Sequence, residues 1–199
     1  MIQTIAVIGA GPIGRGIAHA AASGGYRTIL EDILPASLRR AQGEIRNSLE
    51  TGIERGVLTR ADAEAIGSRI EYAGNIDYAA READLVIEAV PEEMESKLEI
   101  FTLLDRTCRP NTILASNTWA LSITDIASIT YRSQNIVGMR FSQPVEAMEK
   151  LEVVQALGTS PETLAAVVEV GRRMGKIVVI VPEFPPHNSE SNAARPLIG

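Results

Sequence analysis

The chain has 199 residues, of which 45% are hydrophobic and 22% charged, which suits one large domain or one domain with an appendage. This composition excludes a disordered chain, a collagen and a small disulfide-bonded scaffold. The net charge of −6 and the isoelectric point near 5.1 argue against a nucleic acid or an anionic membrane as partner, so any anionic ligand must be held locally.

Short apolar, β-branched runs alternate with helical stretches along the chain. Strands are predicted at 4–8, 28–30, 85–90, 112–115, 135–139, 151–154 and 177–181. Helices are predicted at 13–23, 37–55, 92–106, 123–128 and 161–174. This alternation predicts an α/β fold of the Rossmann type, with a doubly wound, mostly parallel sheet.

Residues 35–69 break the alternation. They hold one long charged helix, an interruption marked by Gly52 and Gly56, and a second short helix after Thr59. One crossover helix would suffice here, so we predict a helical hairpin inserted into the sheet. Residues 182–199 are rich in Pro, Ser and Asn without periodicity, so we expect a domain over 1–181 followed by an irregular tail.

The clearest motif directly follows the first predicted strand. It has the pattern G-x-G-x-x-G and reads Gly9, Ala10, Gly11, Pro12, Ile13, Gly14. Gly9 permits a tight turn, Gly11 lets the backbone approach a pyrophosphate, and Gly14 permits close packing of helix on strand. The start of the next helix offers unpaired amide groups to an anion, so the motif predicts a dinucleotide site.

An acidic residue at the end of the second strand supports this prediction. Glu31 and Asp32 both stand there, and Asp32 follows Gly14 at close to the spacing of about 20 residues expected for the acid that binds the adenosine ribose. Strand alternation turns only one of the two toward the cofactor, and Asp32 is the better candidate. A carboxylate would repel a 2′-phosphate, which favours NAD(H) over NADP(H).

Taken together, these motifs resemble the NAD-binding domain of the 3-hydroxyacyl-CoA dehydrogenases from Ile5 to about Val181. The matching segments are 7–18, 84–92, 114–118, 121–124 and 151–154. The resemblance implies that Ala89, Glu92, Lys97 and Asn117 contact the cofactor, with Glu92 and Lys97 near the nicotinamide ribose and Asn117 beside the reacting centre. The inserted hairpin is where the family places part of its coenzyme A surface.

In that family a histidine exchanges the hydroxyl proton, within the sequence His-Phe-Phe-Asn-Pro, and a glutamate twelve residues later orients it. Here Arg140 replaces the histidine, Gln143 replaces the asparagine, and Glu152 stands at the glutamate position. A guanidinium stays protonated near neutral pH, so Arg140 cannot be the general base. It can pair with Glu152, stabilise an alkoxide or enolate, or clamp a carboxylate. Trp119 replaces a small Ser or Thr and would fill substrate space.

Two functions follow from the resemblance. The first is an NAD-dependent oxidoreductase that transfers a hydride between NAD(H) and a 3-hydroxyacyl or 3-ketoacyl substrate, such as a coenzyme A thioester, with Glu152, Arg140, Asn117 and Gln143 around the reacting carbon. The second is a catalytically impaired NAD(H)-binding module. The family's helical second domain, which usually forms its dimer, is expected to be missing here, either in a truncated paralogue or because a frameshift or cloning sequence supplies the last ~18 residues. A homodimer is one of the states that the family implies.

The remaining reactive residues predict no further chemistry. Cys108 cannot form an internal disulfide, and the first residues lack the features of a signal peptide, so we expect a reducing, cytoplasmic location without a membrane span. His19 is expected to pack or cap, and His187 lies in the tail. No spacing of His, Cys, Asp or Glu predicts a metal site.

Overall fold

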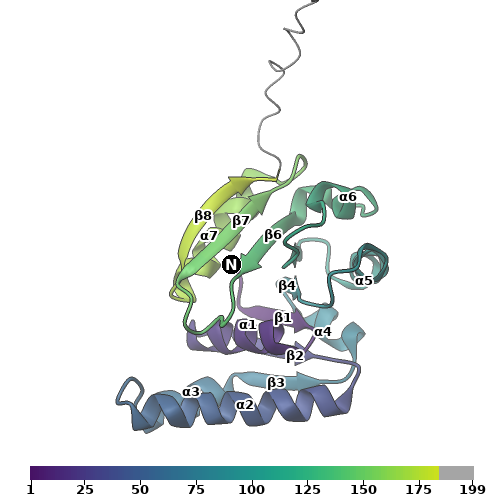
Figure 1. Ribbon diagram of the computed structural model, residues 1–199. Helices are drawn as coiled ribbons and strands as arrows, with labels where there is room; N and C mark the ends of the chain where they lie inside the picture. Colours follow the sequence, from purple (N-terminus) through teal and green to yellow (C-terminus); the bar gives the residue numbers. More distant parts are fainter. Residues whose placement is uncertain (184–199) are drawn as a thin grey trace, which may run out of the picture.

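A computed structural model describes residues 1–183 of the chain (Figure 1). Eight strands form one sheet in the order β3-β2-β1-β4-β5-β6-β7-β8. Their bounds are β1 Thr4–Ile8, β2 Arg27–Glu31, β3 Ile70–Ala73, β4 Leu85–Glu88, β5 Ile113–Ser116, β6 Ile136–Phe141, β7 Lys150–Gln155 and β8 Ile177–Pro182. All neighbours pair in parallel except β6 and β7, so the predicted α/β class and the mostly parallel sheet are confirmed.

Seven α-helices and one short 3₁₀ turn accompany the sheet within residues 1–183. The helices are α1 Pro12–Ser23, α2 Pro35–Glu54, α3 Arg60–Ser68, α4 Ile76–Glu82, α5 Met94–Thr107, α6 Ile123–Ser128 and α7 Pro161–Arg173, and the turn spans Ser133–Asn135. Buried side chains of α1, α2, α3 and α7 form one apolar cluster, and those of α4, α5 and α6 form a second. Within β1, alternate residues join opposite clusters, as the two-residue period of a strand requires. The sheet therefore has helices on both faces.

The predicted hairpin is present, with one correction. Helices α2 and α3, which stand between β2 and β3 in the sequence, pack against each other (Figure 1). Gly52 does not interrupt α2, which continues to Glu54. A Cβ at Gly52 would lie 2.8 Å from the Leu58 side chain, so its glycine allows close packing. Gly56 has φ +69° and reverses the chain, and Thr59 then begins α3 with a capping box.

Two elements lacked a sequence prediction, β3 and α4. Strand β3 is only four residues long and half exposed, and its Glu71 pairs with Arg27 on the surface, so it has no continuous apolar run. Helix α4 has seven residues and is capped by Asn75. Both are short, so each gives only a weak sequence signal, although α4 packs on β1 and β2 and buries two alanines there. The predicted tail over 182–199 lies outside the described residues from 184 onward, so the boundary at 181 stays a prediction.

Candidate functional site

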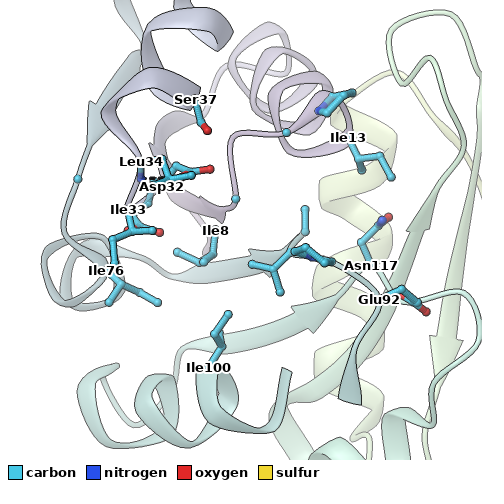
Figure 2. Close-up of a pocket in the computed structure, with 18 of the residues that line it drawn as sticks. Ile8, Ile13, Asp32, Ile33, Leu34, Ser37, Ile76, Glu92, Ile100 and Asn117 are labelled. Carbon is cyan, nitrogen blue, oxygen red and sulfur yellow. Dashed lines mark hydrogen bonds between the residues drawn. The ribbon is translucent and has the colours of Figure 1, made fainter. Parts of the chain in front are cut away.

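A cavity of about 970 Å³ lies at the carboxyl ends of the parallel strands (Figure 2). It opens beside β1 and β4, where the chain order of the sheet reverses, which is the usual ligand position in open α/β sheets. Figure 2 shows Asp32 and Leu34 toward one end and Asn117 and Glu92 toward the other. Its size suits an elongated small molecule.

The glycine motif forms the turn between β1 and α1 at the wall of this cavity. Gly9 has φ +101°, and a Cβ there would lie 2.9 Å from the carbonyl oxygen of Ala89. A Cβ at Gly14 would overlap the carbonyl oxygen of Gly9, so Gly14 is needed for the turn itself. A Cβ at Gly11 would meet no atom within 4 Å and would project into open space. The backbone is therefore open to a ligand at Gly11.

The beginning of α1 provides the positive end of a helix dipole. Pro12 occupies the first turn, which contains no acidic residue. The first backbone amides of a helix lack helical acceptors, and Ile13 of this first turn lines the cavity together with Gly11. These features fit the pyrophosphate of a dinucleotide.

Asp32 is held in a defined orientation just after β2. Its Oδ2 accepts a hydrogen bond from the amide of Ala10 at 2.9 Å, and its Oδ1 accepts one from the amide of Leu34 at 2.8 Å. Each carboxylate oxygen keeps a further lone pair for a ribose hydroxyl. Glu31 also lines the cavity, but burial and the neighbouring charge of Asp32 raise its pKa to about 7. Asp32, which two backbone amides orient, is therefore the better acceptor.

At the other end, Glu92 holds the loop after β5. Its Oε1 accepts hydrogen bonds from the amides of Trp119 at 2.9 Å and Ala120 at 3.0 Å, and from the hydroxyl of Thr118. Burial by itself would raise the pKa of Glu92, but these hydrogen bonds and the charge of Lys97 outweigh it and lower the pKa. Glu92 is therefore an anchored anion at the cavity wall.

Lys97 lies behind the wall, not on it. Its side chain is buried, and its Nζ donates to Glu88 Oε1 at 2.6 Å and to the carbonyl oxygen of Val90 at 3.2 Å. Glu88 Oε2 also accepts a hydrogen bond from Ser116 at 2.6 Å. Lys97 therefore pairs with a buried carboxylate and is linked to the cavity wall through Val90 and through Glu92, whose Oε2 lies 3.7 Å from its Nζ.

The residues predicted around the reacting carbon come from β5, β6 and β7. Asn117 lines the cavity, and its Oδ1 accepts a hydrogen bond from the amide of Phe141 at 2.8 Å, so its side-chain amide group is oriented. Arg140 and Glu152 stand opposite each other in the β6–β7 ladder, with Nη1 and Oε2 4.0 Å apart. Arg140 Nε also donates to the carbonyl oxygen of Thr118 at 3.0 Å.

The ion pair predicted for Arg140 is present but long, because Glu152 has a second partner. Lys150 Nζ lies 2.7 Å from Glu152 Oε1. The guanidinium of Arg140 also lies 6.0 Å from the ring centroid of Trp119. Trp119 and Gln143 both line the cavity, so the indole takes up space at its mouth, as the sequence predicts.

The structure therefore brings most of the predicted residues to one cavity. Those on its wall are Gly9, Gly11, Pro12, Ile13, Asp32, Ala89, Glu92, Asn117 and Gln143. Gly14, Lys97, Arg140 and Glu152 are not part of the wall. Four apolar side chains of the wall were not predicted from the sequence: Ile33, Leu34, Ile76 and Ile100. Ile33 and Leu34 follow β2, and Ile76 follows the unpredicted β3, whereas Ile100 lies in the middle of α5.

The other reactive side chains lie elsewhere. His19 Nδ1 stands 3.9 Å from Glu146 Oε1, away from the cavity wall, which agrees with a packing role. Cys108 is buried, and burial raises its pKa to about 11. His187 lies outside the described residues. Among residues 1–183, no cluster of three metal-ligating side chains occurs and no helix is long and apolar enough to cross a membrane.

Sequence comparison finds a family match over nearly all of this fold. The profile described as "3-hydroxyacyl-CoA dehydrogenase, NAD binding domain" matches residues 4–184. The chain is 40% identical over 184 residues to a probable 3-hydroxybutyryl-CoA dehydrogenase of Bacillus subtilis, covering 92% of this chain and 64% of that protein. It is 38% identical over 175 residues to the 3-hydroxyadipyl-CoA dehydrogenase of Escherichia coli, covering 88% of this chain and 37% of that protein.

Solved structures give the same result. The 3-hydroxybutyryl-CoA dehydrogenase of Escherichia coli K12 matches with a TM-score of 0.90 and 37% identity, over 93% of this chain and 39% of that one. The (S)-3-hydroxybutyryl-CoA dehydrogenase of Ralstonia eutropha also matches with a TM-score of 0.90, at 34% identity, over 93% of this chain and 65% of that one. The chain thus spans less than two thirds of the length of these relatives.

Proposed function

This chain belongs to the 3-hydroxyacyl-CoA dehydrogenase family through its NAD-binding domain, and from that premise we propose that it serves hydride transfer between NAD(H) and a 3-hydroxyacyl or 3-ketoacyl substrate. The observation that supports the proposal is a cavity that has Asp32 toward one end and Glu92 and Asn117 toward the other (Figure 2), with the Arg140–Glu152 pair on the neighbouring strands β6 and β7 outside the cavity wall.

The binding half of the proposal assigns a role to each end of the cavity. Gly11 and the first turn of α1 receive the pyrophosphate, and Asp32 accepts hydrogen bonds from the adenosine ribose. Glu92 lies at the opposite end, where the nicotinamide ribose would stand, and keeps the 118–120 loop in place. Lys97 acts as a positioning residue through Glu92.

The reactive half depends on charge and orientation. The cofactor, when bound, gives or takes a hydride at its nicotinamide ring. The side-chain amide of Asn117, held by the amide of Phe141, would donate to a substrate carbonyl or hydroxyl, and the positive charge of Arg140, held behind the 118–120 loop, would stabilise an alkoxide from outside the cavity wall. Because Arg140 cannot exchange a proton near neutral pH, we expect turnover about 10²–10⁴-fold slower than with a general base.

A second candidate function is a catalytically impaired NAD(H)-binding module. Three contacts of Arg140 favour it: the hydrogen bond to Thr118, the long ion pair with Glu152 and the position over Trp119. Through these contacts Arg140 belongs to a structural cluster, at the sequence position where the family has its general base. In this role the domain would bind cofactor without transferring a hydride.

One set of measurements separates the two functions. Calorimetry gives the NADH affinity, and NADH oxidation with acetoacetyl-CoA or free acetoacetate gives turnover, for the wild type, Arg140→His and Trp119→Ser. The oxidoreductase predicts micromolar NADH affinity, slow turnover, and a rise of ten-fold or more in Arg140→His. Comparison of the two substrates shows whether Arg140 prefers a free carboxylate to a thioester.

Three outcomes count against particular parts of the proposal. Micromolar NADH binding without turnover in any of the three proteins favours the binding module. A fall in turnover in Arg140→His would mean that the arginine itself contributes to catalysis in place of a base. The absence of any heat with millimolar NADH would overturn both functions.

The proposal extends to substrate, assembly and location. The relatives' names support an acyl-CoA thioester as substrate, since they include 3-hydroxybutyryl-CoA and 3-hydroxyadipyl-CoA dehydrogenases. A related Psychrobacter protein is the alpha subunit of a fatty acid oxidation complex, which supports a place in fatty acid metabolism. A cytoplasmic location and a homodimer belong to the same proposal.

A further inference from the structure

Glu31 is a buried carboxyl group in the cavity wall that neither proposed function uses. It is the last residue of β2 and is only 5% exposed. Two backbone amides hold the neighbouring Asp32, whereas within residues 1–183 the Glu31 side chain forms no ion pair and accepts no hydrogen bond. Buried polar groups in folded proteins are nearly always paired. An unpaired carboxyl group in a cavity wall therefore indicates a contact with the ligand.

The Glu31 side chain lies on the face of the sheet that α4 and α5 cover. Glu31 stands beside Ile8 of β1 and Ala73 of β3, and both of these residues belong to the apolar cluster on that face. Residues paired across neighbouring parallel strands point to the same face. Ile76 of α4 and Ile100 of α5 line the cavity and pack against the same cluster (Figure 2). The Glu31 carboxyl group therefore adjoins an apolar part of the cavity.

No cation in the described part of the cavity wall offsets the charge of Glu31. The charged residues of this wall are all acidic, namely Glu31, Asp32, Asp77 and Glu92. Two further acids on the same face of the sheet already have partners, Glu88 in Lys97 and Glu71 in Arg27. Burial and the charge of Asp32 therefore raise the pKa of Glu31 to about 7. A bound pyrophosphate adds negative charge, so Glu31 should hold its proton near neutral pH when the dinucleotide is present.

A protonated carboxyl group matches the hydrogen-bonding pattern of an adenine edge. Its O–H donates and its carbonyl oxygen accepts, and adenine presents an acceptor nitrogen beside its donating 6-amino group. The adenine ring is bonded directly to the ribose assigned to Asp32, so the ring comes close to the residue that precedes Asp32. Ile76 and Ile100 would contact the apolar faces of the ring. An apolar site of this kind keeps a carboxylic acid neutral and able to donate.

We propose that the protonated carboxyl group of Glu31 binds the adenine edge of the dinucleotide, donating to a ring nitrogen and accepting from the 6-amino group. This inference rests on the proposed placement of NAD(H), with the adenosine ribose at Asp32. It gives the chain a selectivity for the adenine base. It also makes coenzyme affinity depend on pH, because binding requires a proton that Glu31 loses in the free chain above about pH 7.

Calorimetry with NADH at pH 6 and pH 8 tests the pH dependence on the full chain. The affinity of the wild type should fall about ten-fold between the two pH values. Glu31→Gln keeps a donor and an acceptor without a titrating proton, so its affinity should stay within about three-fold of the wild type at pH 6 and change little at pH 8. Glu31→Leu removes both groups, so it should bind at least about ten-fold more weakly than Glu31→Gln at either pH.

A modified base tests the adenine contact itself. In the 1,N6-etheno analogue of NAD⁺ a bridge blocks N1 and removes the hydrogens of the 6-amino group. At pH 6 the wild type and Glu31→Gln should bind NAD⁺ about ten-fold more tightly than this analogue. Glu31→Leu should show a much smaller preference, since it makes no hydrogen bond to either base. A preference caused only by the bulk of the bridge would persist in Glu31→Leu.

Controls separate this inference from the proposed function and from loss of folding. Thermal unfolding of each variant at both pH values checks that affinity is measured on the folded chain. Asp77→Asn removes another acid of the wall and leaves Glu31, so the pH dependence should remain. Binding by the wild type that does not change with pH, or equal affinities of Glu31→Gln and Glu31→Leu, overturns this inference alone. The absence of NADH binding in every variant at both pH values overturns the proposed function as well.

Discussion

At the residue scale, Gly11 and Gly14 belong to the same turn, but a side chain added at each would meet different surroundings. Gly11 faces open space, so an added methyl group costs the fold little but enters the space assigned to the pyrophosphate. We expect Gly11→Ala to weaken NADH binding ten-fold or more, with a change in unfolding free energy below about 1 kcal/mol. Calorimetry with NADH and urea unfolding measure the two quantities.

Gly14→Ala is the matched variant. Its methyl group would overlap the carbonyl oxygen of Gly9, so the β1–α1 turn must move. We expect a loss of about 2–4 kcal/mol of stability together with loss of NADH binding. If Gly11→Ala bound NADH as tightly as the wild type, the pyrophosphate would not approach the backbone at this turn.

The raised pKa of Glu31 predicts that the stability of the folded chain depends on pH. Burial, with the charge of Asp32, raises its pKa from the ordinary value of 4.5 to about 7, so the folded chain retains a proton that the unfolded chain has released. Stability should therefore fall as pH rises from about 4.5 to about 7. Glu31→Gln removes this loss and should be more stable than the wild type at pH 8 by about 1–3 kcal/mol.

Urea unfolding of the cofactor-free chain between pH 5 and pH 8 measures this effect. The advantage of Glu31→Gln should shrink toward pH 5, because the wild-type carboxyl is then protonated in the folded chain. Glu50→Gln is the control, since Glu50 is exposed on α2, and its curve should follow the wild type. Parallel curves for Glu31→Gln and the wild type would exclude a raised pKa at Glu31.

At the scale of elements, the loop between β6 and β7 depends on a buried lysine. Lys176 Nζ donates to the carbonyl oxygens of Val145 and Met148, the latter at 2.9 Å. Lys176→Met would leave both carbonyls without this donor, so we expect a loss of about 2–3 kcal/mol. Amide hydrogen exchange at Ala147 and Met148 should accelerate, while exchange in β1 follows only the global change.

Lys150→Met provides the comparison for this loop. Lys150 is exposed and contacts Glu152 instead of backbone carbonyls, so its replacement should leave exchange at Ala147 unchanged. Gln143 belongs to the same loop and lines the cavity. If both variants altered exchange equally, Lys176 would have no specific role in holding the loop.

The elements differ in how far the sequence predicts them. β1, the glycine turn and α1 are predicted because strand, turn and helix signals follow one another within a short segment. β3 and α4 were missed because they are short and because their burial depends on strands far away in the sequence, β2 for β3 and both β1 and β2 for α4. The start of α5 at Met94 instead of residue 92 reflects the contacts of Glu92 with the 118–120 loop, which no local pattern records.

At the scale of the whole molecule, the sheet order places the candidate site. The acid after β2, the turn after β1 and the amide after β5 meet because their strands run in parallel toward one edge. The sequence predicts this meeting, since it depends only on fold class and residue order. The sequence does not predict that the Lys97 side chain is buried, nor the distance between the charged groups of Arg140 and Glu152, because both depend on side-chain packing.

The far side of the sheet ends in an apolar strand. β8 pairs only with β7, and Ile177 and Ile180 are 61% and 52% exposed within the part of the chain that the structure describes. Strands of this kind offer both apolar side chains and unpaired backbone groups to other chains. β8 is therefore an exposed sheet edge, within the described residues, that could pair with another chain.

The chain contains a single tryptophan, and Trp119 lies in the cavity wall. Indole emission overlaps the absorption band of the reduced nicotinamide ring, so a dihydronicotinamide bound beside Trp119 would quench its fluorescence and emit in its place. The residue that narrows the site is thus also an optical reporter built into it. Occupancy can be followed in real time without a label, and the oxidised coenzyme, which lacks that band, should give no such sensitised emission.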